Sequence, residues 1–191
     1  MRFKKSLIMM LLLVLTMLVL PAMASAEWIG VYHFKHLDAQ GNVIAEWESP
    51  NSLADEGEQF FLDAFLRGAT APTTFYLGLT DSTSACSIAD TATLTTAAAL
   101  GEPSTNGYAR IEVERSAVGW PTLALDSGDY QATSKTVTFS ASGGSWGPVY
   151  CAFLGTTSNN TGKLISYAAL STGRTLASGE SLQITYKVKL Q

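Results

Sequence analysis

The chain has 191 residues and a formal net charge of −4, and 15% of its residues are charged. A protein that binds nucleic acid through its phosphates needs a basic surface, so this acidic composition argues against nucleic acid as a partner. The length and the hydrophobic content of 47% suit one folded domain with a sizeable core.

The first 26 residues have the three parts of a secretory signal peptide. The start is basic, an apolar run covers residues 7–20, and small residues occupy positions 24–26. A membrane-spanning helix is the alternative because the apolar run is long, but the small residues and Pro21 favour cleavage. We therefore predict a mature chain that begins at Glu27 and is secreted or held at the cell surface, with a periplasmic location as a further option. It has no membrane contact after cleavage, and because the segment contains three cations and no acid, its removal makes the net charge −7.

The two cysteines, Cys86 and Cys151, both lie in the exported part. In an oxidising compartment we expect them to form a disulfide that closes a long loop and contributes roughly 4 kcal/mol. Two buried free thiols are the alternative. One pair of cysteines cannot form a zinc site by itself.

The mature chain starts with a hairpin and a helix. Alternating residues predict strands over 28–37 and 42–48, joined by a turn. Apolar residues then recur at helical spacing over 52–67, with Ser52 and Asp55 resembling a capping box and Gly68 marking the end. We expect the apolar side of this helix to pack on a sheet.

From residue 73 onward the pattern has the period of a β-strand. Two antiparallel sheets in a sandwich, or a compact barrel, would accommodate about six to eight such strands. The segment 81–106 is too long for a plain connection, which indicates a functional or interface loop. The predicted organisation is one β-rich domain over 27–191, with the hairpin in 27–50, the helix in 52–67 and the sandwich in 73–191. The strands are expected over residues 73–80, 108–114, 135–141, 148–155, 163–170 and 181–190.

The stretch Tyr108–Glu114 carries the charges that most resemble catalytic machinery. Tyr108, Arg110, Glu112 and Glu114 share one parity of the predicted strand, so we expect Arg110 and the two glutamates to face water. Two carboxylates on one strand face could also act as a glycosidase pair. Any acidic pair two residues apart satisfies that spacing, so the solvated face is the preferred interpretation.

Other polar motifs have structural interpretations as well. His33 and His36 are three apart on a predicted strand and point to opposite faces, so they cannot bind one metal ion together. Asp126 and Asp129 enclose Ser-Gly, which is typical of a turn more than of a calcium site. Ser145 matches the G-x-S-x-G pattern, but it joins two strands and no histidine follows it. The sequence therefore predicts no metal, no cofactor and no enzyme.

Aromatic residues are the remaining binding candidates. Trp120 and Trp146 lie beside turn residues, where a ring can stack on a sugar or anchor a protein interface. They can equally close the ends of the core. Residues 28–36, which include Trp28 and Tyr32, form a strand just after the cleavage site. Such a strand could complete a neighbour's sheet.

Several segments in order resemble tailed-bacteriophage virion proteins of the minor structural or tail-fibre-associated type. The resemblance runs from about residue 37 to the C-terminus and rests on LDAQGNVIAEWESPNSLADEGEQFFLDAFLRG, TTFYLGLTDS, EPSTNGYARIEVE, TVTFSASGGSWGPVYCAFLG and SGESLQITYKVKLQ. It implies a non-enzymatic β-rich subunit that assembles with itself or with other structural proteins. The signal peptide and the two cysteines are not part of that family's pattern.

The resulting expectation is an exported structural subunit of an extracellular or surface structure, in the form of a homo-oligomer or filament. The alternative is a secreted carbohydrate- or surface-binding module that uses Trp120, Trp146 and the loop 81–106. A hydrolase that uses Glu112 and Glu114 is the third possibility.

Overall fold

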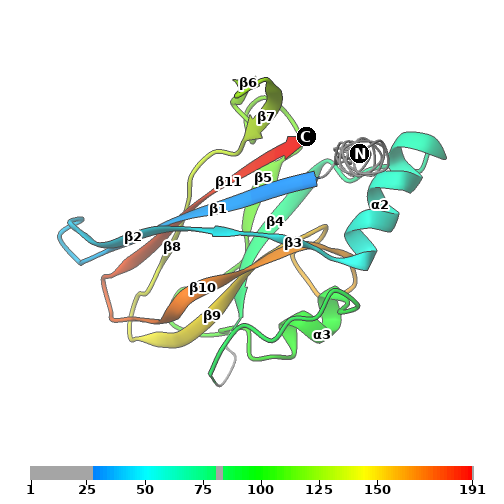
Figure 1. The fold of residues 1–191 in the computed structure, drawn as a ribbon. Helices are drawn as coiled ribbons and strands as arrows, with labels where there is room; N and C mark the ends of the chain where they lie inside the picture. Colours follow the sequence, from blue (N-terminus) through cyan, green and yellow to red (C-terminus); the bar gives the residue numbers. More distant parts are fainter. Residues whose placement is uncertain (1–27, 81–83, 191) are drawn as a thin grey trace, which may run out of the picture.

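The computed structural model describes residues 28–80 and 84–190, which form two antiparallel sheets packed face to face (Figure 1). The predicted signal peptide, residues 1–26, lies outside the described residues. Within the described ranges the sheets contain eleven strands and do not close into a barrel. The predicted β-sandwich is confirmed, with more strands than the six to eight expected.

Sheet A has six strands in the order β2-β1-β11-β7-β6, and β8 also pairs with β11. Strand β1 lies beside β11 over its whole length, from Trp28 opposite Leu190 to Leu37 opposite Ser181, and pairs with β2 on its other edge. The first strand thus lies in its own sheet here, and its donation to a neighbour stays a prediction. The strands are β1 (Trp28–Leu37), β2 (Val43–Pro50), β6 (Thr122–Asp126), β7 (Asp129–Thr133), β8 (Val137–Ser140) and β11 (Ser181–Leu190).

Sheet B has five strands in the order β3-β10-β9-β4-β5. Its centre is the long antiparallel pair of β9 and β10, and β4 lies on the other side of β9. The strands are β3 (Ser52–Leu53), β4 (Thr74–Thr80), β5 (Ile111–Glu114), β9 (Trp146–Gly155) and β10 (Leu164–Leu176).

The main core lies between the two sheets because alternate residues of each strand point inward. In β1 and β11 the even-numbered positions from 30 to 36 and from 182 to 188 are buried, for example Tyr32 opposite Tyr186 and Phe34 opposite Ile184. Full burial of one such side chain stabilises the fold by about 1.5 to 3 kcal/mol. His33 and His36 lie on opposite faces, as predicted: His33 contacts Glu46 on the exposed side, and the buried His36 contacts Glu180.

The outer face of sheet B is also covered, which explains why β9 is buried on both faces from Cys151 to Gly155. The covering segment runs from residue 84 to 100 and includes the short helix α3 (Leu94–Ala98). Its apolar side chains pack on β9 in a second core cluster made of Ala54, Ile88, Leu94, Ala97, Cys151, Phe153 and Leu164. The disulfide between Cys86 and Cys151 ties this segment to β9, with the two Cα atoms 5.0 Å apart. The predicted disulfide is confirmed.

Helix α2 (Asp55–Leu66) is shorter than the predicted 52–67 and begins differently. Ser52 belongs to β3, and the N-cap is Ala54, whose side chain forms no capping hydrogen bond, so the predicted capping box is wrong. The carboxylate of Glu56 instead accepts hydrogen bonds from the backbone N–H groups of Leu94 and Leu164, at 3.2 and 2.7 Å. These bonds join the first turn of the helix to both neighbouring segments. Gly68, at φ 72°, follows the end of the helix as expected.

The hairpin of β6 and β7 was not among the predicted strands. All five residues of β6 are exposed, so the strand has no buried face, and its five residues are too short a stretch to show a clear period of two. Asp126 and Asp129 close the hairpin through a two-residue turn, Ser127-Gly128, in which both residues have positive φ. The turn predicted for the DSGD sequence is therefore confirmed.

Candidate binding pocket at the open end of the sandwich

A pocket of about 460 Å³ opens at the end of the sandwich where β1 begins and β11 ends. Helix α2 forms one side of it, and the β6–β7 hairpin projects from the body nearby (Figure 1). Residues of both sheets and of helix α2 line it. Its lining consists of Trp28, Phe60, Phe61, Ala64, Phe65, Ala69, Ala71, Phe75, Arg115, Trp120, Ala132, Leu154, Ile165, Tyr186 and Val188.

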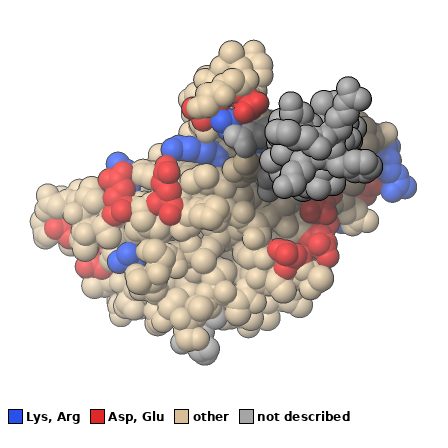
Figure 2. Space-filling view, viewed as in Figure 1, with Lys and Arg blue, Asp and Glu red and all other residues tan. Residues whose placement is uncertain are grey.

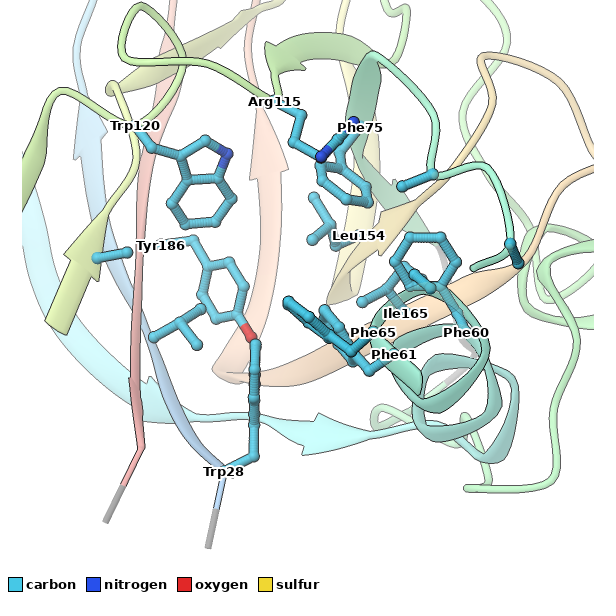
Figure 3. Close-up of a pocket in the computed structure, with 15 residues that line it drawn as sticks. Trp28, Phe60, Phe61, Phe65, Phe75, Arg115, Trp120, Leu154, Ile165 and Tyr186 are labelled. Atoms are coloured by element: carbon cyan, nitrogen blue, oxygen red, sulfur yellow. The ribbon is translucent and has the colours of Figure 1, made fainter. Parts of the chain in front are cut away.

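Aromatic rings from four elements form most of the wall. Figure 3 shows Trp28, Trp120 and Tyr186 on one side of the opening and the phenylalanines of α2 on the other. The ring centroids of Trp28 and Phe61 are 4.3 Å apart, and those of Trp120 and Tyr186 are 6.0 Å apart. These contacts hold the rings in place, so the pocket is a preformed apolar site.

The pocket lining offers few polar groups to a ligand. Among the described residues that line the pocket, Arg115 carries the charge. The Nε of Arg115 donates a hydrogen bond to the carbonyl of Pro72 at 2.8 Å. The hydroxyl of Tyr186 accepts a hydrogen bond from Asn51 at 2.9 Å. Burial raises the pKa of Tyr186 to about 12, so this group is a neutral phenol at physiological pH. The site therefore suits an apolar or aromatic group, with one cation at its edge.

Exposed apolar side chains surround the opening. We call Phe65, Leu123, Leu125, Tyr130 and Leu190 the apolar rim; each is at least 60% exposed. Leu123 pairs across the hairpin with Ala132, and Leu190 pairs with Trp28, and both partners line the pocket. Phe65, Leu123 and Leu190 thus lie in the pocket lining or beside it, and a group of exposed apolar side chains is the usual mark of an interaction site.

The helix explains part of this surface and corrects one prediction. Phe60 is buried and Phe61 is half-buried against the core, as expected for a helix that packs on a sheet. Leu62, Phe65 and Leu66 are exposed instead, because α2 reaches beyond the end of the sheets. The apolar stripe of α2 is therefore wider than its contact with the core, and the remaining apolar side chains lie in solvent.

The four predicted aromatic candidates separate into two groups. Trp28 and Trp120 line the pocket. Tyr32 has no exposed surface, and its hydroxyl is 2.9 Å from Ser166 Oγ; Trp146 is 5% exposed and packs edge-on against Tyr108. Phe61, Phe65 and Tyr186, which complete the pocket, were not recognised from the sequence because they come from distant elements.

Arg110 does not face water, contrary to the prediction. Residues 108–110 precede β5, so the strand parity does not extend to them. The side chain of Arg110 is 3% exposed and forms two hydrogen bonds with Glu102, at 2.8 and 2.7 Å. Its guanidinium also lies over the ring of Phe153 at 5.0 Å. This buried pair joins the residue before β5 to Glu102, two residues after the covering segment, and to the loop after β9, where the guanidinium bonds to Asn159 and Asn160.

The two glutamates of β5 are occupied by structural contacts. Tyr76 donates a hydrogen bond to Glu112 at 3.3 Å, and Lys135 contacts Glu114 at 2.7 Å. The hydrogen bond from Lys135 lowers the pKa of Glu114, whereas a glycosidase needs one carboxyl whose pKa is raised. This geometry does not support the hydrolytic alternative.

A second, polar pocket of about 450 Å³ shares Trp28 with the first. It lies at the start of α2, and Asp55, Glu58 and Asp90 contribute its carboxylates. Tyr167 donates a hydrogen bond to Asp90 at 2.7 Å. In the described part of the chain, no group of three or more histidine, cysteine or acidic residues is placed to hold a metal ion.

Across residues 28–80 and 84–190, no helix has the length and apolar character needed to cross a membrane.

Comparison with known proteins identifies the family. No curated protein and no solved structure matches the chain significantly. A family model described as podophage GP4 fiber I protein gp80 matches residues 52–188, which run from β3 to β11 and cover more than half of the chain. The predicted resemblance to phage virion structural proteins is therefore confirmed, and the chain belongs to the podophage GP4 fiber I protein gp80 family.

Proposed function

We propose that the protein is an exported, non-enzymatic subunit of an extracellular fibre or surface structure, and that its apolar end is the contact surface for a neighbouring subunit. The observation that carries the proposal is the pocket with its apolar rim. An exposed surface of this kind is unfavourable in water and is typical of proteins that bury it against a partner. The family, a phage fibre protein, supports a structural role.

Export is supported by two independent features. The first 26 residues have the composition of a signal peptide, and Cys86 forms a disulfide with Cys151. Disulfides persist in oxidising compartments and are rare in the cytosol. Protein recovered from outside the producing cell is expected to begin at Glu27 by N-terminal sequencing. Recovery of the intact N-terminus in a membrane fraction would instead favour the anchor.

Assembly through the apolar end can be tested with two matched substitutions. Phe65→Lys places a charge on the rim, and Ile44→Lys places the same charge on an exposed apolar residue of β2, near the other end of β1. We expect the wild-type protein to form oligomers or fibres by electron microscopy and solution mass measurement. Phe65→Lys should weaken the association about tenfold or more, because it puts a charge into a desolvated contact. Ile44→Lys should leave it unchanged.

Two outcomes would contradict this proposal. A wild-type protein that remains monomeric at all accessible concentrations has no self-contact. Equal effects of Phe65→Lys and Ile44→Lys would show that the apolar end is not the contact surface.

The alternative is a carbohydrate-binding module that uses the same pocket. Trp28 and Trp120 at the opening favour it, because sugar rings stack on aromatic faces. It predicts a monomer that binds glycans on an array and loses this binding in Trp120→Ala. The small number of polar groups in the pocket makes it the second choice, since sugar recognition also needs hydrogen-bonding partners.

A further inference from the structure

The outer edge of β6 is the least protected sheet edge of the molecule. The edges formed by β2, β3, β5 and β8 each have a feature that discourages pairing with a foreign strand. Strand β2 carries Glu46 and Glu48 and ends at Pro50, β5 carries Glu112 and Glu114, and β3 is two residues long. Strand β8 lies against β5. Strand β6, with the sequence TLALD, has one charge, Asp126, at its end, and all its residues are exposed.

The backbone groups on that edge are set by the hairpin turn. Asp126 and Asp129 flank a two-residue turn and form the first hydrogen-bonded pair, so hydrogen-bonded and non-bonded pairs alternate from there along the ladder. Leu125 opposite Tyr130 and Leu123 opposite Ala132 are then non-bonded pairs. The N–H and C=O groups of Leu123 and Leu125 therefore point away from β7. Among the described residues no strand lies on that side of β6.

We propose that β6 pairs antiparallel with β6 of a second copy of this chain, about a two-fold axis at Ala124. In this register Leu123 of one copy faces Leu125 of the other, and their outward N–H and C=O groups form both hydrogen bonds of each pair. Thr122 faces Asp126, so the two carboxylates stay apart. A parallel arrangement in register would place Asp126 beside its own copy, which like-charge repulsion disfavours.

The side chains fit the same two-fold arrangement. Leu123, Leu125 and Tyr130 lie on the face of the sheet that also carries Ala132 of the pocket. An axis perpendicular to the sheet places these residues of both copies on the same side, where they cover one another. Lys189, at 3.4 Å from Asp126, contacts the hairpin from the C-terminal strand of the same chain. The two copies of sheet A become one continuous sheet.

The shape of the molecule permits this approach. The hairpin projects from the body, so a second hairpin can reach its edge without a clash between the two sandwiches (Figure 1). In the space-filling view the projecting hairpin is largely uncharged, with acidic and basic atoms at its base (Figure 2). This inference deepens the proposed function and rests on it, because it names the partner as a second copy and identifies the strand that joins the two.

Cysteine crosslinking of the full-length protein tests the register. Ala124 faces itself across the axis as a non-hydrogen-bonded pair, whose Cβ atoms lie roughly 4.5 to 5.5 Å apart, close to what a disulfide requires. We expect Ala124→Cys to form a disulfide-linked dimer under mild oxidation. Thr122→Cys alone should not crosslink, because the two copies of residue 122 would be about 14 Å apart along the strand at 3.4 Å per residue. A mixture of Thr122→Cys and Asp126→Cys should crosslink.

A second variant tests the backbone pairing itself. Leu125→Pro removes an N–H that is not used within the hairpin, so the monomer should keep its thermal stability. The dimer loses one hydrogen bond at each of its two equivalent pairs, and we expect its dissociation constant to rise about tenfold or more. Dimerisation unaffected by Leu125→Pro would contradict the pairing.

Failure of this inference can be separated from failure of the proposed function. If oligomers persist and respond to Phe65→Lys but Ala124→Cys does not crosslink, the β6 pairing is overturned and assembly through the apolar end stands. Equal crosslinking of Thr122→Cys and Ala124→Cys would also overturn the register, because it indicates random collision. A wild-type monomer at every concentration would overturn both.

Discussion

At the scale of single residues, Arg110 differs most clearly from what the sequence pattern predicts. It was expected to face water, and it forms a buried ion pair with Glu102. A guanidinium that is almost fully enclosed must have all its donors satisfied, and here a carboxylate, backbone carbonyls and an asparagine side chain provide the acceptors. The pair fastens three segments that are distant in sequence. Its role is structural, since the guanidinium is occupied by contacts within the chain.

We expect Arg110→Ala to lower the free energy of unfolding by about 3 kcal/mol or more, because it leaves the carboxylate of Glu102 buried without its partner. The matched control is Arg67→Ala, which removes an exposed arginine whose ion pair with Asp63 lies on the helix surface. That change should cost less than about 0.5 kcal/mol. Urea unfolding of both variants measures the difference. Similar losses in the two variants would show that the Arg110 pair contributes no more than a surface contact.

Three buried tyrosines give the protein a pH dependence at high pH. Burial raises the pKa of Tyr32 and of Tyr108 well above the usual value, and that of Tyr186 to about 12. Because each pKa is higher in the folded chain, the stabilisation is complete below the unfolded pKa of about 10 and is lost as the pH rises through the folded values.

Ultraviolet titration of phenolate absorbance checks the raised pKa values of these three tyrosines. Of the seven tyrosines, these three are expected to stay protonated in the folded protein at about pH 11, whereas in denaturant all seven ionise near pH 10. Tyr186→Phe should remove one of the late-ionising groups. Ionisation of all seven at about pH 11 in a chain that is still folded would contradict the burial of these side chains.

At the scale of elements, the segment 84–100 shows how a stretch without regular pattern becomes part of the fold. Its apolar residues cover the outer face of sheet B, and the disulfide fixes one end of it to β9. The sequence indicated an interface or functional loop here. The structure shows a cover for a second core cluster, held by Cys86, by the contacts of Leu94 and by the hydrogen bonds of Glu56.

Removal of the disulfide should destabilise the protein substantially. The bridge spans 65 residues, and restricting a loop of this size in the unfolded chain is worth about 4 kcal/mol. We expect the double variant Cys86→Ala, Cys151→Ala to lose roughly that much in urea unfolding. A reducing agent should lower the stability of the wild type and leave the double variant unchanged. Unchanged wild-type stability under full reduction would show that the bridge constrains little.

At the scale of the whole molecule, the two sheets and helix α2 share one core. The main cluster includes Tyr32 and Phe34 of sheet A, Leu77 and Val149 of sheet B, and Phe60 of the helix. Strands β1 and β11 pair along their full length, so the two ends of the described chain are held together in one sheet. We therefore expect one cooperative unit; the single domain over 27–191 stays a prediction.

Coincident unfolding curves would support that expectation. The four tryptophans report tertiary packing by fluorescence, and far-ultraviolet circular dichroism reports the strands. Both signals should follow one urea transition with one midpoint. Separate midpoints would indicate that the hairpin or the covering segment unfolds independently of the sandwich.

The proposed assembly surface also belongs to this scale. Helix α2, the β6–β7 hairpin and the ends of β1 and β11 meet at one end of the molecule and leave apolar side chains uncovered. No single element shows this in its sequence, because each has an ordinary apolar side. It is the excess of apolar surface over available partners within the chain that points to a neighbouring subunit.

The sequence by itself determined the fold class, most of the strands, the disulfide and the family. Two-residue alternation specifies a strand with one buried face, and two cysteines in one chain have one possible pairing within it. These signals are local, or depend on composition, and they need no knowledge of neighbours.

The tertiary structure alone decided which side chains are covered. Arg110 is buried, Tyr32 and Trp146 lie in the core, and Phe65 and Leu123 are exposed, although their sequence patterns suggested otherwise or gave no signal. Periodicity states which residues share a face, but it does not state what packs on that face. That choice depends on contacts between elements far apart in the chain, and these contacts place the pocket and its apolar rim at one end of the sandwich.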